Sequence, residues 1–181
     1  MYTDPREADL VRRFQEGDVD AADALAKKYT RVTVGLVYSN IGAVQECDDL
    51  VQEVFLEAQK SVKHLRDPAR FPSWLYKITR RVCNRWVREH RRAPQLLETP
   101  EEVEQPPESD GGAGPTPDEI RRVVDGMPQA LREVIYMRYF ETLSYERMAA
   151  LLGISPSAIN ARLMKARKLL KSRMASGIDR E

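Results

Sequence analysis

The sequence has very few of the residues from which enzyme sites and disulfide scaffolds are built. Its 181 residues include two cysteines and two histidines. Cys47 and Cys83 are too few for a disulfide framework and lack metal-ligand spacing, and His64 and His90 lie far apart. No glycine-rich phosphate loop follows a strand, and no nucleophile, base and acid form a set. We therefore expect no enzyme, no metal and no cofactor, and the cysteines suit a reducing compartment.

Long apolar stretches are missing as well. No apolar run approaches the roughly 20 residues that cross a bilayer. The N-terminal MYTDPREADL also lacks the apolar core of a signal peptide. We therefore expect a soluble, cytoplasmic protein. Apolar residues make up 42% of the sequence, a normal share for a globular protein, so a packed core is possible.

The near-neutral net charge of +1 hides a strong segregation of charge along the chain. Residues 1–59 hold 6 basic and 12 acidic side chains, and residues 60–92 hold 11 and 2. Residues 93–119 hold 8 acidic side chains and no basic one, whereas residues 120–181 hold 12 basic and 6 acidic ones. Two basic segments separated by an acidic one indicate two surfaces for a polyanion, with ordinary solvated helix faces as the alternative.

The acidic stretch QLLETPEEVEQPPESDGGAGPTPDE (residues 95–119) is rich in proline and glycine and divides the chain. After Val103 it has almost no large apolar residue, so it cannot bury enough surface to offset the entropy lost on ordering. We interpret residues 93–117 as a flexible acidic linker between domains of residues 1–92 and 118–181. Such a linker would let the two domains close on each other or wrap a partner.

Apolar residues recur every three or four positions in both domains, which is the spacing of one helix face. No run alternates with a period of two long enough to indicate a sheet. We therefore expect an all-α fold of two small helical domains, with a further helix beginning after Pro128. The apolar stripes are Ala22, Leu25, Tyr29, Val32 and Leu36; Val44, Cys47, Val51, Val54, Ala58 and Val62; Leu75, Ile78, Val82 and Trp86; and Ile159, Leu163, Ala166 and Leu170.

A row of cations follows the third stripe. Lys77, Arg81, Arg85, Arg88 and Arg92 are three or four residues apart, so on a helix they share a face opposite the apolar one. Like charges at this spacing repel each other by a few tenths of a kcal/mol per pair. The segment supplies a single acid, Glu89, so we expect a row of nucleic-acid phosphates to provide the missing anions.

The loop before that helix, HLRDPARFPSW (residues 64–74), mixes aromatic and basic residues. Phe71 and Trp74 lie near Arg66 and Arg70 in the sequence. Unpaired bases stack on aromatic rings while their backbone meets arginines, so this loop is typical of single-strand binding. The alternative is that both rings are core residues, and for Trp74 we favour it.

The segment SYERMAALLGISPSAINARLMKARKLLKSRM (residues 144–174) carries the most specific pattern. Ser144 can cap a helix that ends at Leu152, and Gly153 can take the left-handed position after it. Ser155 can then cap a second helix with Pro156 at its first position. Helix, glycine turn and helix make a helix-turn-helix unit, whose second helix enters the DNA major groove. An ordinary pair of antiparallel helices is the alternative.

The second helix of this unit has two contrasting faces. Its apolar stripe, given above, would face the core. Its outward face mixes hydrogen-bonding, apolar and cationic side chains, as base reading and phosphate contact require. The outward residues are Ser157, Asn160, Ala161, Met164 and Lys165, with Arg162, Arg167 and Lys168 at the margins.

These segments resemble a known family. GMPQALREVIYMRYFETLSYERMAALLGISPSAINARLMKARKLL (residues 126–170) resembles the promoter-binding region 4 of bacterial extracytoplasmic-function (ECF) sigma factors. ADLVRRFQEGDVDAADALAKKY (residues 8–29), DDLVQEVFLEAQK (residues 48–60) and FPSWLYKITRRVCNRW (residues 71–86) resemble region 2. The resemblance implies a sigma factor that binds core RNA polymerase, directs it to promoters and helps to melt the minus-ten region. It further implies a chain that is monomeric when free, has no small-molecule substrate and is restrained by an anti-sigma factor.

The resemblance assigns a role to three sets of residues and to the linker. The linker would run through the positively lined channel of the polymerase. Core polymerase would be bound by Asp49, Gln52, Glu53 and Phe55. Minus-ten DNA would be bound by Arg66, Arg70, Phe71, Lys77, Arg81, Asn84, Arg85 and Arg88. The minus-thirty-five element would be bound by Ser155, Ser157, Asn160, Ala161, Arg162, Met164, Lys165 and Arg167.

The sequence departs from the family at both DNA-facing helices. Many relatives have asparagine and aspartate at the positions of Arg81 and Arg85, and we expect the two arginines to strengthen phosphate attraction. Asn160 and Ala161 stand where a basic residue and serine are frequent, and asparagine can bond adenine bidentately. A DNA-binding regulator that works without polymerase remains the alternative function, and recruitment of core polymerase would separate the two.

Overall fold

The computed structural model describes residues 5–42, 45–90 and 116–178, and within these ranges the chain is helical, with no strand. The predicted all-α fold is confirmed there, whereas residues 93–115 of the predicted linker lie outside the described residues. None of the described helices has the length and hydropathy to cross a membrane. The elements are α1 (Pro5–Gln15), α2 (Val19–Ile41), α3 (Cys47–Ser61), η1 (Val62–His64), η2 (Pro68–Arg70), α4 (Phe71–His90), α5 (Pro117–Asp125), α6 (Gln129–Ile135), η3 (Tyr136–Phe140), α7 (Tyr145–Leu152) and α8 (Pro156–Ile178).

The N-terminal unit, α1–α4, packs the predicted apolar stripes into one core. Asp18 begins α2 by accepting a hydrogen bond from the backbone N–H of Ala21. The stripe residues of α2, α3 and α4 are buried, except that Ala22 and Trp86 are half-buried and Val44 lies outside the described residues. Both cysteines are buried, Cys47 as a member of its predicted stripe and Cys83 next to the stripe residue Val82. The stripes therefore fix which side of each helix is left for solvent and partners.

The C-terminal unit, α5–α8, begins inside the last residues of the predicted linker. Thr116 caps α5, and its side chain and that of Glu119 bond each other's backbone N–H groups, which is a capping box. Pro128 precedes α6 as its N-cap residue, one position earlier than the first helical turn. The η3 segment after α6 is a π-helical turn, and α7 and α8 follow.

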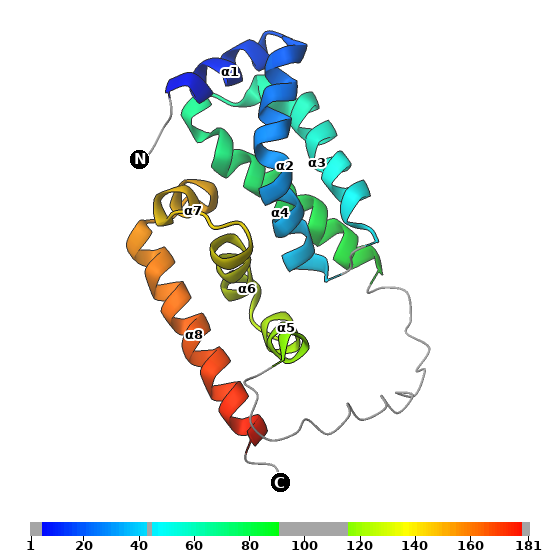
Figure 1. Cartoon of the computed structure of the whole chain (residues 1–181). Helices are drawn as coiled ribbons and strands as arrows, with labels where there is room; N and C mark the ends of the chain where they lie inside the picture. Colours follow the sequence, from blue (N-terminus) through cyan, green and yellow to red (C-terminus); the bar gives the residue numbers. More distant parts are fainter. Residues whose placement is uncertain (1–4, 43–44, 91–115, 179–181) are drawn as a thin grey trace.

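The two units lie against each other (Figure 1). Helix α4 contacts α7, and α2 contacts both α6 and η3. Apolar residues of the two units belong to one continuous cluster, in which Leu36 and Leu75 are joined by Val134 and Leu151. The closed arrangement that the linker would permit is therefore the arrangement that the structure has. It covers one side of α4 and leaves the outer face of α8 to solvent (Figure 1).

Candidate nucleic-acid interface

The turn between α7 and α8 has the geometry predicted for a helix-turn-helix unit. The Ser144 hydroxyl accepts a hydrogen bond from the backbone N–H of Arg147 (3.3 Å), and the Ser155 hydroxyl accepts one from that of Ala158 (3.2 Å). Gly153 ends α7 at a φ of 66°, in the left-handed region that favours glycine. Two capped helices with a left-handed residue between them fix the angle at which α8 projects from the unit.

Helix α8 presents the two faces that its sequence predicts. Ile159, Leu163 and Ala166 are fully buried against the rest of the unit. The outward residues Ser157, Asn160, Ala161, Met164 and Lys165 are exposed, and Leu170 is half-buried. This open surface carries amide, thioether and ammonium groups, which suit hydrogen bonding and apolar contact with base edges and attraction to phosphates.

Five of the residues predicted to bind the minus-thirty-five element also have hydrogen-bond partners within the fold. Two of them pair with each other, since the Asn160 amide donates to the Met164 sulfur (3.8 Å). The Ser155 hydroxyl caps α8 and lies 2.9 Å from the Ser157 hydroxyl. Arg162 is half-buried. Arg167 is exposed, donates a hydrogen bond to the Tyr139 hydroxyl (2.9 Å) and lies over that ring. Ser155 and Arg167 therefore also shape the unit.

A basic groove follows the exposed side of α4. Its volume is about 660 Å³, and it is lined by Tyr76, Lys77, Arg80, Arg81, Asn84, Arg85 and Arg88. Lys77, Asn84 and Arg88 are exposed and make no ion pair among the described residues. The groove thus brings five of the eight predicted minus-ten residues together, while Arg92, predicted for the same row, lies outside the described residues.

Two of the groove arginines are paired with carboxylates of α3. Arg81 donates to Glu57 (2.6 Å), and Arg85 donates to Glu57 (3.0 Å) and to Glu53. Partial burial raises the pKa of Glu57, but the hydrogen bonds from both arginines outweigh it, so its pKa is lower than usual. The expectation that phosphates alone supply the anions for this row is therefore wrong for Arg81 and Arg85. Helix α3 supplies them, and a stripe read along α4 does not reveal a partner on another helix.

The other side of the groove is fixed by a buried polar cluster between the two units. Glu133 of α6 is 1% exposed and accepts hydrogen bonds from the Tyr76 hydroxyl (2.8 Å) and from the Asn40 amide (3.2 Å). Gln129 also donates to Glu133 (3.2 Å) and accepts from Arg80 (3.1 Å). Burial, and then the nearby Glu133 carboxylate, raise the pKa of Tyr76. Arg80 is thereby held at the contact between α4 and α6.

The loop before α4 differs from its prediction. Phe71, predicted to contact minus-ten DNA, is 1% exposed and packs edge-on against Tyr29, with 5.4 Å between ring centres. This residue is a core residue because it begins α4 on the buried side. Trp74 is half-buried against Phe71, as we favoured. Arg66 and Arg70 are exposed, and Arg70 lies 3.4 Å from Asp67.

The residues predicted to bind polymerase fall on two sides of α3. Gln52 and Phe55 line an apolar groove of about 550 Å³ between α2 and α3. Asp49 is exposed, whereas Glu53 faces α4 and pairs with Arg85. Sequence reasoning missed two lining residues, Val19 and Leu56, which are 77% and 53% exposed. The sequence signal that could have revealed them is a large apolar side chain on the otherwise polar face of an amphipathic helix.

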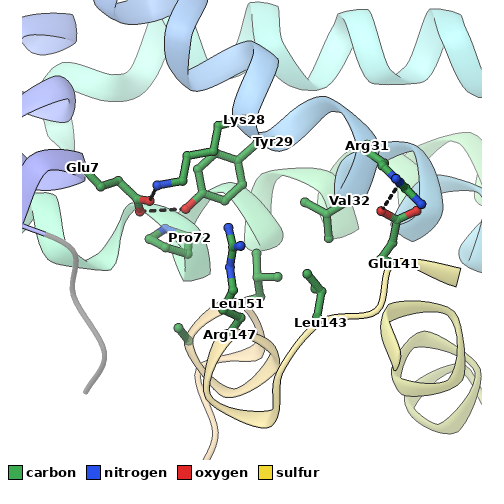
Figure 2. A pocket seen from close by; sticks show the side chains of 11 residues that line it. Glu7, Lys28, Tyr29, Arg31, Val32, Pro72, Glu141, Leu143, Arg147 and Leu151 are labelled. Carbon is green, nitrogen blue, oxygen red and sulfur yellow. Dashed lines mark hydrogen bonds and ion pairs between the residues drawn. The ribbon is translucent and has the colours of Figure 1, made fainter. Parts of the chain in front are cut away.

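A third cavity, of about 360 Å³, lies where the two units meet. Figure 2 shows Lys28 and Tyr29 directed toward Glu7 at one end, and Arg31 paired with Glu141 at the other (2.8 Å). None of the residues predicted to bind DNA or polymerase lines it. Of its paired charges, Arg31 and Glu141 join the two units, whereas Glu7 and Lys28 both belong to the N-terminal unit.

The described residues contain no group of three or more His, Cys, Asp or Glu side chains that could hold a metal ion. Burial, and then the nearby Glu133 carboxylate, raise the pKa of the Cys83 thiol to about 12. That thiol is therefore fully protonated at neutral pH.

Comparison of the chain with known proteins identifies its family. The family model "Sigma-70 region 2" matches residues 25–93, and "Sigma-70, region 4" matches residues 118–170. Together the two cover most of the chain, in the order that the sequence predicts. The chain belongs to the sigma-70 family, as an ECF sigma factor.

Three curated relatives match along nearly their whole length. RNA polymerase sigma-H factor of Pseudomonas aeruginosa is 29% identical, over 94% of this chain and 94% of the relative. The ECF RNA polymerase sigma-E factor of Escherichia coli is 27% identical (91% and 92%), and that of Haemophilus influenzae is 25% identical (91% and 93%). As a sigma factor, this chain associates with RNA polymerase and takes part in transcription initiation.

Two solved structures share the fold. One is CnrH in complex with the cytosolic domain of CnrY, with a TM-score of 0.65, 22% identity, and coverage of 94% of this chain and 97% of that one. The other is the sigma factor RpoE in complex with the anti-sigma factor NepR from Bartonella quintana. Its TM-score is 0.51 at 20% identity, over 87% and 99% of the two chains. In the chain described in this structure, region 2 contains α3, α4 and most of α2, and region 4 contains the helix-turn-helix unit.

Proposed function

We propose that this sigma factor binds core polymerase through the α2–α3 groove, single-stranded minus-ten DNA through the α4 groove, and the minus-thirty-five element through α8. The observation that carries the proposal is the helix-turn-helix unit, whose second helix buries Ile159, Leu163 and Ala166 of its apolar stripe and exposes a mixed polar face. An apolar groove bordered by Gln52 and Phe55 supports a protein contact on the other unit. A domain of residues 1–92 would thus act in core and minus-ten binding, and a domain of residues 118–181 in minus-thirty-five binding.

An anti-sigma factor that covers these surfaces belongs to the same proposal. The solved structure of similar fold that contains NepR holds a sigma factor with its anti-sigma factor. The partly exposed apolar side chains of the α2–α3 groove are a surface that such a partner could cover. We further propose that the chain acts in the cytoplasm and has no catalytic activity of its own, consistent with its family.

Co-elution with bacterial core RNA polymerase tests the proposal. We expect the wild-type chain to co-elute and a Gln52→Ala/Phe55→Ala double variant to lose most of the complex. Lys60→Ala, on the same helix but outside the groove, is the matched control and should co-elute like wild type. Folded wild-type chain that fails to bind polymerase but binds duplex DNA would instead favour a regulator that works alone.

A further inference from the structure

The carboxylates that α3 directs toward the α4 groove give the groove a charge balance that its sequence does not suggest. Glu57 bonds both Arg81 and Arg85, and Glu53 bonds Arg85. Two of the five cations lining the groove are therefore neutralised from within the fold, and Arg80 is held by Gln129. Of the five groove cations, Lys77 and Arg88 thus have no side-chain partner among the described residues, and their charge is free to attract DNA.

We propose that Glu57 is a positioning residue that competes with DNA phosphates for Arg81 and Arg85, and so limits the non-specific binding of single-stranded DNA by this sigma factor. The proposal rests on the proposed role of α4 in minus-ten binding. Phosphate attraction acts on every sequence alike, whereas base contacts discriminate. A chain that restrains two arginines therefore loses affinity for all DNA sequences equally. Base contacts then contribute a larger fraction of its remaining binding free energy.

The exposure of the three side chains permits this competition. The side chain of Glu57 is 21% exposed, whereas that of Arg81 is 62% exposed and that of Arg85 is 33% exposed. Glu57 thus lies beneath the arginines, and both guanidinium groups can still be approached from solvent. Each guanidinium has five N–H donors, so a phosphate can bind on the outer side while the carboxylate draws it inward.

Binding of a short fluorescent single-stranded oligonucleotide of mixed sequence by the full chain tests the proposal. The salt dependence is compared for wild type, Glu57→Gln and a matched control, Glu16→Gln. Glu16 is exposed on the turn after α1, outside the groove, and its substitution changes the net charge equally. Glu57→Gln frees Arg81, whereas Arg85 keeps its pair with Glu53. The slope of log affinity against log salt should therefore become steeper by about 0.7, the contribution of one phosphate contact. Between 200 and 50 mM salt that is about a 2.6-fold larger gain in affinity than Glu16→Gln shows.

Two further variants tie the effect to the arginines. In an Arg81→Gln/Arg85→Gln background, Glu57→Gln should no longer change the slope. Glu57→Asp keeps the carboxylate and should bind more like wild type than Glu57→Gln does. Equal slopes for Glu57→Gln and Glu16→Gln would overturn the proposal, and so would an effect that persists without the arginines.

Failure of the wider function would look different. Arg88 makes no ion pair among the described residues, so Arg88→Ala should weaken oligonucleotide binding whatever Glu57 does. If Arg88→Ala weakens binding while Glu57→Gln matches its control, the competition is wrong and the α4 role stands. If neither variant changes binding, the α4 role itself is wrong.

Discussion

Helices α4 and α8 are the two basic helices proposed to face DNA, and the fold treats their cations differently. On α4, Arg81 and Arg85 are paired with α3 carboxylates. On the outer face of α8, Lys165 and Lys168 are exposed and have no ion pair among the described residues. The difference teaches that a row of cations in a sequence measures the charge of a helix but not the charge available to a ligand. Availability depends on which neighbouring helix lies alongside.

The largest expected effect is at the buried side of α4. Glu133→Leu would leave the Tyr76 hydroxyl without its acceptor in the buried contact between the units. It would also remove one acceptor of the Asn40 amide, which still donates to the Leu36 carbonyl. We expect the free energy of unfolding to fall by roughly 1–3 kcal/mol. Urea unfolding measures it, with Tyr76→Phe as a milder comparison that should lose about 1 kcal/mol. A Glu133→Leu variant more stable than Tyr76→Phe would show that the cluster does not hold α4 in place.

The open face of α8 allows base reading to be separated from phosphate attraction. Asn160→Ala should relax the preference for one position of the upstream promoter element, by roughly 1–3 kcal/mol if the amide bonds adenine bidentately. Lys165→Ala should weaken binding to all sequences alike and reduce the salt slope on duplex DNA by about 0.9. Transcription from a set of promoter variants measures the sequence preference, and fluorescence anisotropy of duplex DNA across a salt series measures the slope. Equal loss for Asn160→Ala on every variant would contradict a base-reading role.

Within α4, a free and a paired cation can be compared directly. Arg88→Ala should reduce the salt slope for single-stranded DNA by about 0.7, the contribution of one phosphate contact. Arg81→Ala should reduce it by less, because Glu57 already occupies part of that guanidinium. Fluorescence anisotropy across a salt series gives both slopes. Equal reductions would mean that the ion pair between Glu57 of α3 and Arg81 of α4 does not affect DNA binding.

The smallest expected effect is the pH dependence of the α3–α4 pairs. The pKa of Glu57 is lower in the folded chain than its ordinary value of about 4.3. Its ion pairs therefore stabilise the fold fully above that ordinary value, and the stabilisation is lost as pH falls through the lowered folded-state pKa. Wild type should be slightly more stable than Glu57→Gln at pH 7, with the difference vanishing in acid. Urea unfolding of both proteins at pH 7 and at a pH below the folded-state pKa of Glu57 checks this. A stability difference between them that grows in acid would be inconsistent with the pairing.

Much of the fold followed from short-range patterns. The helix-turn-helix unit was predicted from Ser144, Gly153 and Ser155, and the structure has these caps and the left-handed glycine where expected. The buried and exposed faces of α8 followed from helical spacing in the same way. Caps and stripes can be predicted because each is set by residues within a few positions of one another.

The interface could be predicted only in part, because its charge balance is formed by residues far apart in the sequence. Arg81 pairs with Glu57, 24 residues earlier, and Tyr76 bonds Glu133, 57 residues later. Its basic neighbours in the sequence led us to predict that Phe71 contacts DNA, but its position at the start of α4 directs the ring into the core. The sequence by itself determined the helices, their inward faces and the family. Only the packing of α3 and α6 against α4 decided which cations remain free, because Coulomb pairing depends on distances that helix packing sets.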